Sequence, residues 1–540
     1  MRLLLSGCLA VLSFFAFTLV TNTVEADIEL PKLFADHMVL QQNQSMRISG
    51  TADKAEQLIV KFNGQEVAAV ADGNGKWSAI ICTGRAGGPF QLEVASRNSE
   101  TKVVFNDVLV GEVWICAGQT NMRFPVEQSK GADEHIESAK KFPMIRGFDV
   151  GQTASALPQK DFADVDSWFC CSPDSIKDFS AIAYLFGREL SKKLDVPIGL
   201  INVSSRSTTL EAWTPYDVLE TDGSFDQLLK HWEERNEPTN PNRVSSSYNA
   251  MVSPLSGFAF RGVIWYQGES NVGRGAQYRR MFPLMIKSWR KKLGQPQCPF
   301  LFVQPTPFRY EEQPVEALPE IWDAQLKTFC SVQGTGMVVS TDVGCVDCNQ
   351  PVEKLPIAER LSNWAFAGCY AKTLTEMEAA RQKQEKLEPA ESTDTGEQQK
   401  RGSAEKLENK QDKEKDNPQQ THALLRLSTN IVASGPIYES AKTHDNQIVI
   451  QFKMAAGGLY LSSDSEHGFT ICGADRKFLA AQVEVSGNQL IVSHPDISKP
   501  IAVRYGWSDT ASATLRNATG LPASPFRTDE FPLISDGVEF

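Results

Sequence analysis

Short apolar segments alternate with helical patterns between Asp107 and Thr373, and this alternation constrains the fold more than any other feature of the chain. The strand candidates in this part are Val108–Ile115, Ile198–Val203, Gly262–Tyr266, Phe300–Val303 and Met337–Ser340. Between them, Ala181–Leu194 and Tyr278–Leu293 each place apolar residues on one face of a helix. Alternating strands and helices predict an α/β fold with a doubly wound parallel sheet. In such a sheet, a functional site lies at the carboxyl ends of the strands.

Patterns typical of β-strands flank this central part on both sides. Residues 27–106 and 431–540 contain short runs in which apolar and polar residues alternate, separated by turn signals such as Asn63-Gly64. These runs predict a β-sandwich-like domain at each end of the central domain, which spans residues 107–373. Residues 374–430 are expected to be a charged, low-complexity, disordered insertion. Within them, Arg381–Gln420 has 19 charged residues in 40 and too few large apolar residues to form a core.

The first 26 residues have the pattern of a secretory signal peptide. Arg2 precedes an apolar run, Leu9–Val20, and Val24–Ala26 supplies the small residues that a signal peptidase recognises. We therefore expect export to the periplasm or the cell exterior, and no membrane span in the mature chain from about Asp27 onward. The formal net charge of -12 argues against nucleic-acid binding, which depends on a basic surface.

Polar residues follow four of the strand candidates in the central part. They are Gln119–Asn121 after the first, Arg206–Ser207 after the second, Gln267–Asn271 after the third, and Asp347–Gln350 after the last. Because the carboxyl ends of parallel strands meet at one edge of a sheet, these segments are expected to line one crevice.

The sequence predicts neither a cofactor nor a metal for this crevice. The chain has no dinucleotide-binding glycine motif, no P-loop and no G-x-S-x-G motif. Cys345 and Cys348 are half of a zinc-ligand set, but no second pair follows at metal spacing.

The four segments, in this order, resemble the sialate O-acetylesterases, a branch of the SGNH hydrolases. The most specific match is Arg261–Asn271, with the sequence RGVIWYQGESN. The other matches are Leu33–Gln42, Gly111–Trp114, Glu211–Pro215, Tyr248–Met251, Gly457–Leu459, Gly473–Asp475, Ala502–Trp507 and Gly520–Asp529, so the resemblance covers almost the whole mature chain. It implies a flavodoxin-like, three-layer SGNH sheet and an enzyme that removes O-acetyl groups from sialic acid or related sugars.

The resemblance also assigns chemistry to the four segments. In the family, a serine attacks the acetyl carbonyl, a histidine takes its proton, an aspartate orients the histidine, and N–H groups bind the oxyanion. The matching positions here are Thr120 for the serine, Gln350 for the histidine, Asp347 for the orienting acid, Arg206 and Ser207 for the oxyanion glycines, and Asn271 for the oxyanion amide. Substrate contacts are expected from Gln119, Asn121, Gln267 and Glu269.

Several of these positions depart from what the chemistry needs. The methyl group of Thr120 crowds a tight turn, Arg206 and Ser207 replace glycines, and Gln350 cannot accept a proton near pH 7. Of the seven histidines, only His135 and His231 lie in the central part, and both are outside the four segments.

Two classes of function therefore follow from the sequence. One is an exported, sialate O-acetylesterase-like enzyme with an impaired site. The other is a catalytically silent protein that binds acetylated sugars or glycans. A glycosidase-like pair formed by Glu211 and Glu269 is a further alternative, although nothing in the sequence fixes the distance between these carboxylates.

Overall fold

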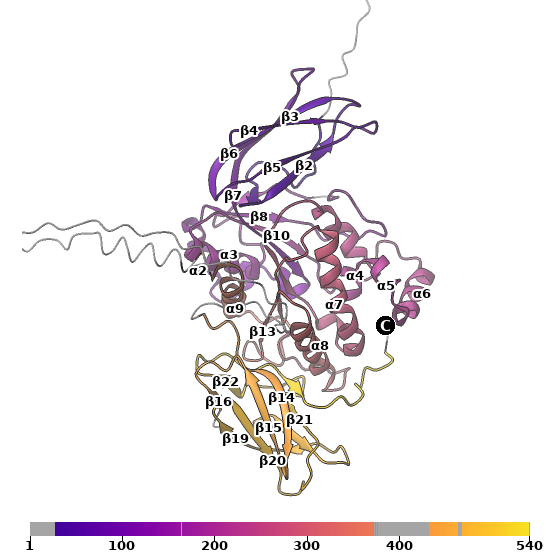
Figure 1. Cartoon of the computed structure of the whole chain (residues 1–540), viewed down its shortest axis with the longest axis vertical. Coiled ribbons are helices and arrows are strands. Elements are labelled where there is room, and N and C mark those ends of the chain that lie inside the picture. The colour runs from indigo at the N-terminus through magenta and orange to yellow at the C-terminus, as the bar shows by residue number, and fades with distance from the viewer. Residues whose placement is uncertain are drawn as a thin grey trace, which may run out of the picture.

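The structure of the chain is a computed structural model that describes residues 28–163, 165–371, 373, 375, 431–462 and 467–538. The predicted signal peptide and most of the predicted charged insertion lie outside these residues. Figure 1 shows three parts in a row, with β-strands at the top, an α/β part in the middle and a second group of β-strands at the bottom. Among the described helices, none combines the length and the apolar character that crossing a bilayer requires.

A parallel sheet forms the middle part. Its strands are β7 (Lys102–Gly118), β8 (Ile145–Asp149), β10 (Ile198–Ser204), β11 (Gly262–Tyr266), β12 (Phe300–Val303) and β13 (Thr335–Val338), and the short β9 (Phe169–Cys170) pairs antiparallel to β8. The spatial order is β13-β12-β11-β7-β10-β8. From β10 to β13, the order in the chain reads 2-1-3-4-5, which is the flavodoxin-like order. The predicted fold class is therefore confirmed.

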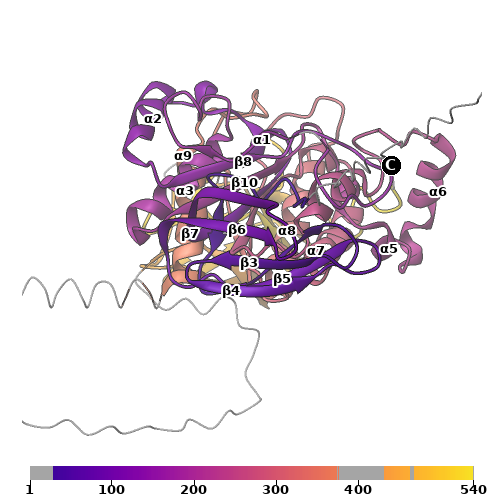
Figure 2. The same cartoon turned by 90° about the horizontal axis from the view of Figure 1, so that it is seen from above.

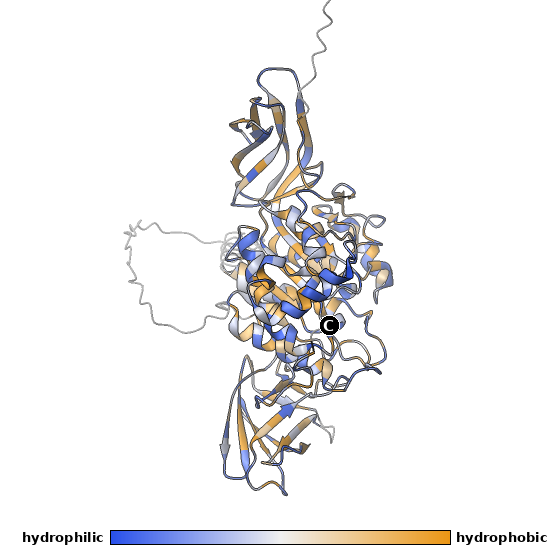
Figure 3. Cartoon of the chain, turned by 90° about the vertical axis from the view of Figure 1, so that its right-hand side faces the viewer, coloured by the Kyte–Doolittle hydropathy of each residue, from blue (hydrophilic) through white to orange (hydrophobic). Residues whose placement is uncertain are grey.

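The longer helices cover both faces of this sheet. Figures 1 and 2 show α3 (Ala181–Leu194) and α9 (Leu355–Ala365) on one side, and α7 (Gly275–Lys292) and α8 (Ala317–Ser331) on the other. The limits of α3 are those that the sequence predicts, and the side chain of Ser180 caps its first turn by accepting the N–H of Ala183. In Figure 3, blue hydrophilic stretches mark the helices facing the viewer, while orange predominates deeper in the middle part.

Shorter helical segments connect these elements. The α-helical ones are α1 (Thr120–Arg123), α2 (Ala132–Ser138), α4 (Leu210–Trp213), α5 (Tyr216–Leu219) and α6 (Asp226–Arg235). The 3-10 turns are η1 (Val126–Gln128), η2 (Ala139–Lys141), η3 (Gly223–Phe225), η5 (Ser253–Leu255) and η6 (Glu269–Asn271), and the π turns are η4 (Tyr248–Val252) and η7 (Phe366–Tyr370).

The N-terminal β part shares a strand with the central sheet. Its strands are β1 (Val39–Gln41), β2 (Ser45–Thr51), β3 (Gln57–Phe62), β4 (Gln65–Val70), β5 (Lys76–Cys82) and β6 (Gly87–Ser96). The first half of β7 pairs with β6, and its second half pairs with β10 and β11. The strand predicted at Val108–Ile115 is thus part of a longer strand, and the domain boundary predicted between residues 106 and 107 falls inside it.

The C-terminal part consists of antiparallel strands. They are β14 (Ile437–His444), β15 (Gln447–Lys453), β16 (Leu459–Leu461), β17 (Phe469–Cys472), β18 (Leu479–Ala480), β19 (Gln482–Ser486), β20 (Gln489–Ser493), β21 (Ala502–Tyr505), β22 (Leu515–Asn517) and β23 (Phe526–Arg527). They form the sheets β14-β15-β20-β19 and β18-β17-β21-β23 and the pair β16-β22.

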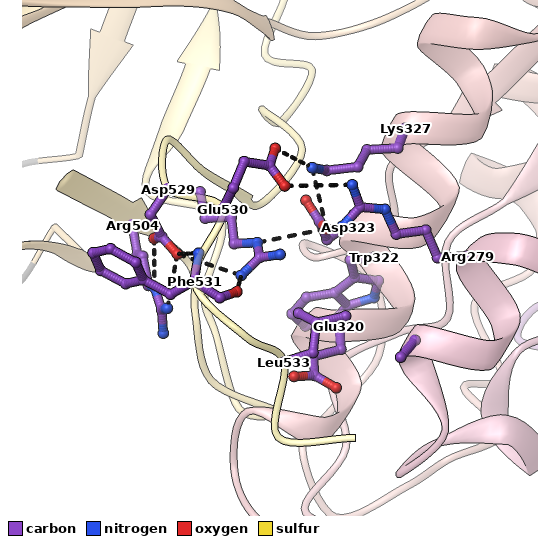
Figure 4. Close-up of polar contacts among 12 residues, drawn as sticks. Arg279, Glu320, Trp322, Asp323, Lys327, Arg504, Asp529, Glu530, Phe531 and Leu533 are labelled. Carbon is purple, nitrogen blue, oxygen red and sulfur yellow. Dashed lines mark hydrogen bonds and ion pairs between the residues drawn. The ribbon is translucent and has the colours of Figure 1, made fainter. Parts of the chain in front are cut away.

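An ion-pair network holds this C-terminal part against the helices of the middle part (Figure 4). Arg527, at the end of β23, lies 3.6 Å from the carboxylate of Asp323 in α8 and 3.3 Å from that of Asp529. Glu530 accepts a hydrogen bond from Lys327 of α8 at 2.6 Å. Both carboxylates at Arg527 are almost fully buried, so the network fixes the position of the last strand on α8.

A second buried carboxylate, that of Glu112 in β7, connects the N-terminal and middle parts. Arg261 donates to both of its oxygens, at 2.6 and 2.9 Å, and the Tyr370 hydroxyl donates to it at 2.8 Å. The side-chain amides of Gln41 and Gln42 donate to it from the end of β1, at 3.2 and 2.7 Å. The Glu112 side chain is only 1% exposed, so these donors replace its contact with water.

Replacing Glu112 by glutamine should therefore destabilise the protein strongly. The substitution leaves the guanidinium of Arg261 without its counter-charge, and breaking a buried pair in this way costs about 3 kcal/mol or more. Urea unfolding of Glu112→Gln measures the loss. Asp217→Asn, which removes the carboxylate of an exposed pair with Lys292, should change the free energy of unfolding by about 1 kcal/mol at most. Equal, small losses in both variants would contradict a special role for Glu112.

Candidate active site

The carboxyl end of β7 is the point from which the candidate site is built. β7 lies between β10 and β11, so the chain order reverses on its two sides and the strands separate at this point. Gly118 has a φ of 142°, and a Cβ there would lie 2.2 Å from the carbonyl oxygen of Tyr266. The next residue, Gln119, donates its N–H to that carbonyl at 3.0 Å. A glycine is therefore needed where β7 ends against β11.

Thr120, the predicted nucleophile position, is in direct contact with the segment that follows β10. Its Oγ1 accepts the backbone N–H of Ser207 at 3.1 Å. Ser207 has a φ of 55°, the left-handed conformation that favours glycine, which agrees with the glycine expected at this position. Asn242 holds the segment in place, because its side chain donates to the Ser207 carbonyl at 3.2 Å and accepts the N–H of Thr209 at 2.8 Å.

Asn271, the predicted oxyanion amide, is buried against the same segment. Its Oδ1 accepts the N–H of Leu210 at 2.8 Å and the side-chain amide of Gln267 at 2.7 Å. Its Nδ2 donates to Glu211 at 2.9 Å, and Glu211 in turn forms a buried ion pair with Arg274. One amide hydrogen of Asn271 is therefore used to fix its orientation, and the second is left for a ligand. The contacts of Glu211 are those of a residue that positions Asn271.

Glu269 connects the two residues on either side of Thr120. Its Oε2 accepts the side-chain amide of Gln119 and its Oε1 accepts that of Asn121, each at 2.5 Å. Burial raises the pKa of Glu269, although these hydrogen bonds oppose the shift by favouring the carboxylate. These hydrogen bonds restrain the turn that carries Thr120 through the residues on either side of it. These contacts give Gln119, Asn121 and Glu269 a role in positioning Thr120, and the substrate contacts expected of them stay a prediction.

Lys354 belongs to the same network and was not identified from the sequence. It is 1% exposed, and its Nζ donates to Asn121 Oδ1 at 2.7 Å and lies 4.4 Å from the centre of the Phe124 ring. Burial lowers its pKa from 10.5 to about 7, although the nearby Glu269 acts in the opposite direction. The one signal in the sequence is a lysine directly before the apolar residues that begin α9.

The backbone of the loop after β13 contacts Asn121, the residue that follows Thr120. Asn121 Nδ2 donates to the carbonyl of Asn349 at 2.8 Å. Gln350 is the next residue in the loop after this contact. Asp347, the predicted orienting acid, is 70% exposed and pairs with Arg309 at 2.8 Å. It is a solvated residue of the loop, directed at Arg309.

The Arg206 side chain is exposed at the opening of the site. Its backbone N–H donates to the side-chain oxygen of Gln152 at 2.9 Å, and this bond anchors the turn before Ser207. The structure thus brings residues after β7, β10, β11 and β13 to one edge of the sheet, as the sequence predicts.

A base for the Thr120 hydroxyl is not found in the part of the chain that the structure describes. The Ser207 N–H is the one hydrogen-bond partner of Thr120 Oγ1 there. His135 is buried against Arg188 at 3.2 Å, and burial together with this guanidinium lowers its pKa. His37 contacts Asp107 at 2.8 Å, toward the opposite end of β7.

His37 and Asp107 also belong to a cluster of metal-type ligands that Cys170 completes. Arg146 donates to the same oxygen of Asp107 that His37 contacts, at 3.0 Å. Its guanidinium charge opposes a cation at this position, so the cluster is better explained as a hydrogen-bonded ion pair.

The buried Lys354 leads to a pH-dependent prediction. Between about pH 7 and 10.5, the unfolded chain holds a proton on this amine that the folded protein has released, so the folding stability of the native protein rises with pH. Lys354→Met has no ionisable amine at this position, so its stability lacks this dependence on pH. We expect the stability of the native protein relative to this variant to rise by up to ~1.4 kcal/mol per pH unit between pH 7 and 9. Urea unfolding at several pH values measures the difference.

Lys230→Met is the matched control, because that side chain is 74% exposed. Its stability difference from the native protein should stay flat over the same range. A flat difference for Lys354→Met as well would show that the amine is not held in a buried site.

Comparison with known proteins supports the resemblance seen in the sequence. Residues 110–349 match the family model described as a carbohydrate esterase, sialic acid-specific acetylesterase. The chain is 31% identical over 339 residues to the sialate O-acetylesterase of Pongo abelii. The matched region covers 58% of this chain and 64% of that protein, so the chain spans slightly less than two thirds of this relative. It is 30% identical over 399 residues to that of Mus musculus, covering 63% of this chain and 73% of that protein.

A solved structure resembles the chain over nearly its whole length. A carbohydrate acetylesterase from Xanthomonas citri superimposes with a TM-score of 0.76 and 27% sequence identity, covering 94% of this chain and 100% of the other. Sequence and fold agree, and the chain belongs to the sialate O-acetylesterase family.

Proposed function

We propose that the protein binds O-acetylated sugars, sialic acids first among them, in the crevice beside Thr120, and that it hydrolyses them poorly. The ligand class is supported by the relatives, which are named sialate O-acetylesterases. The impaired hydrolysis rests on one observation. The hydroxyl oxygen of Thr120 receives an N–H from Ser207, and no described side chain is placed to take its proton. A neutral hydroxyl without a base is a poor nucleophile.

The positions of the groups explain how an acetyl group would be held. The free amide hydrogen of Asn271 is available to the acetyl carbonyl oxygen, since the other one is bonded to Glu211. The Ser207 N–H, which would serve the same oxygen in an oxyanion hole, is directed at Thr120 Oγ1 instead. The Thr120 hydroxyl therefore occupies an N–H group that an oxyanion hole would need. The third part of an ester-cleaving site, the base, is replaced by Gln350.

Restoring the two missing groups should restore hydrolysis. Thr120→Ser together with Gln350→His supplies a nucleophile and a base at once, and members of such a unit act non-additively. We expect the double variant to cleave a chromogenic aryl acetate at least ~10-fold faster than either single variant, while native protein stays at the level of Thr120→Ala. If native protein already matches the double variant and Thr120→Ala abolishes the activity, the protein is an active esterase and the proposal is wrong.

Binding can be tested independently of hydrolysis. Titration calorimetry with the uncharged methyl ester of an O-acetylated sialic acid should show weak binding and an unchanged ligand. Asn271→Ala should weaken it by ~1 kcal/mol, the usual net value of one hydrogen bond. Asn517→Ala removes a buried asparagine of comparable bonding in the C-terminal part and should leave the affinity unchanged. Absence of binding by native protein would remove the sugar-binding function.

A further inference from the structure

A cavity lies between the loop after β13 and the C-terminal β part. It has a volume of about 450 Å³, within the range of cavities that hold small molecules. One wall is formed by residues 341–346 and the other by residues 510–514 and Arg516. Gly344, in the first wall, packs against Pro351, because a Cβ on it would lie 2.7 Å from the Pro351 ring. Neither Thr120 nor any residue that contacts it or Asn271 is among the residues that line this cavity.

An ion-pair cluster lies at one side of this cavity. The carboxylate of Asp342 is bound by two guanidinium groups, by Arg360 through both oxygens at 2.7 Å and by Arg516 at 3.0 Å. Burial alone would raise the pKa of Asp342, but the hydrogen bonds and charges of Arg360 and Arg516 outweigh it and hold this pKa below its usual range. One carboxylate is thus shared by two guanidinium groups, of which that of Arg516 belongs to the lining of the cavity. Asp342 and Arg516 are the ionic groups among the residues that line the cavity.

Hydrogen-bonding capacity is also left over in the walls. The Thr341 side chain is 8% exposed, and within the described part of the chain its hydroxyl has no hydrogen-bond partner. A buried hydroxyl without a partner costs free energy, which a ligand oxygen would recover. Within the ranges that the structure describes, Arg516 makes two hydrogen bonds, to Asp342 and to the Gly520 carbonyl, and both use Nη1. Its Nη2 and Nε hydrogens are therefore available to a planar carboxylate. Thr510, Ser512 and Thr514 add further hydroxyls to the lining.

We propose that the cavity between Thr341 and Arg516 binds a sugar that carries a carboxylate. The Nη2 and Nε hydrogens of Arg516 select for the carboxylate, and the threonine and serine hydroxyls suit the hydroxyl groups of a sugar ring. Neutral sugars lack the charge, and small carboxylates lack the hydroxyl groups. This second binding site does not depend on the proposed function of the crevice, because no residue of the Thr120 site lines it.

Cys345 offers a way to locate binding within the molecule. Its thiol is exposed and it is one of the lining residues, whereas Cys82 is an exposed thiol in the N-terminal β part. The probes are N-acetylneuraminic acid, its uncharged methyl ester, and acetate. We expect saturating N-acetylneuraminic acid to slow alkylation of Cys345 by iodoacetamide, measured by peptide mass spectrometry, and to leave Cys82 unaffected. The ester and acetate should protect Cys345 much less. Unchanged labelling of Cys345, or equal protection by acetate, would overturn the proposal.

Two variants test the assigned groups by calorimetry with the same acid. Thr341→Val removes a hydroxyl that has no partner among the described residues, so it should fold normally and bind at least ~5-fold more weakly. Arg516→Met should bind at least ~10-fold more weakly, and Arg516→Lys should recover part of the loss. Thr328→Val is the control for Thr341→Val, because Thr328 is a threonine of α8 that does not line the cavity. It should leave the affinity unchanged.

Normal affinity in both Thr341→Val and Arg516→Met would show that the acid binds elsewhere, and would refute this site. That result leaves the proposal for the crevice intact, because the crevice is tested through Asn271 with an acetylated ligand.

Discussion

The carboxylate of Glu112 is the contact on which the arrangement of the N-terminal and middle parts depends. It receives hydrogen bonds from the end of β1, from the residue that precedes β11 and from the π turn after α9. A buried carboxylate is stable only while such donors surround it. These segments therefore cannot shift independently of one another. Because Glu112 lies within β7, they also fix the strand whose carboxyl end carries Gly118 and Thr120.

The sequence predicts the strands and helices of the middle part well, because its sheet is buried on both faces and its strands are short apolar runs. β11 and β12 have the predicted limits, and so does α3. The first half of β7 was missed, since its partner is β6 rather than another strand of the central sheet. β13 begins two residues earlier than predicted, where Thr335 and Gly336 give no apolar signal.

The sequence is less informative about the site. It identifies the four polar segments because each follows a strand, but it does not show which side chains within them face one another. Lys354 and Asn121 are bonded across 233 residues, and no local pattern reports such a pair. The left-handed conformation of Ser207 is a similar case. The backbone at this position has the conformation that favours glycine although the residue is a serine. Only the structure shows that the N–H of Ser207 is bonded to Thr120.

The shared strand β7 has a consequence for how the chain folds during synthesis. Its first half can pair with β6 as soon as residues 87–107 have left the ribosome, because the two strands form a hairpin. Its second half, from Glu112 to Gly118, is apolar apart from Glu112 and pairs with β10 and β11, which are made roughly 90 and 150 residues later. Until then, the residues of β7 from Glu112 onward lack the strands that pair with both of their edges in the folded sheet, a state that favours association with other chains. The nascent chain is thus most exposed to aggregation just after its first domain has formed.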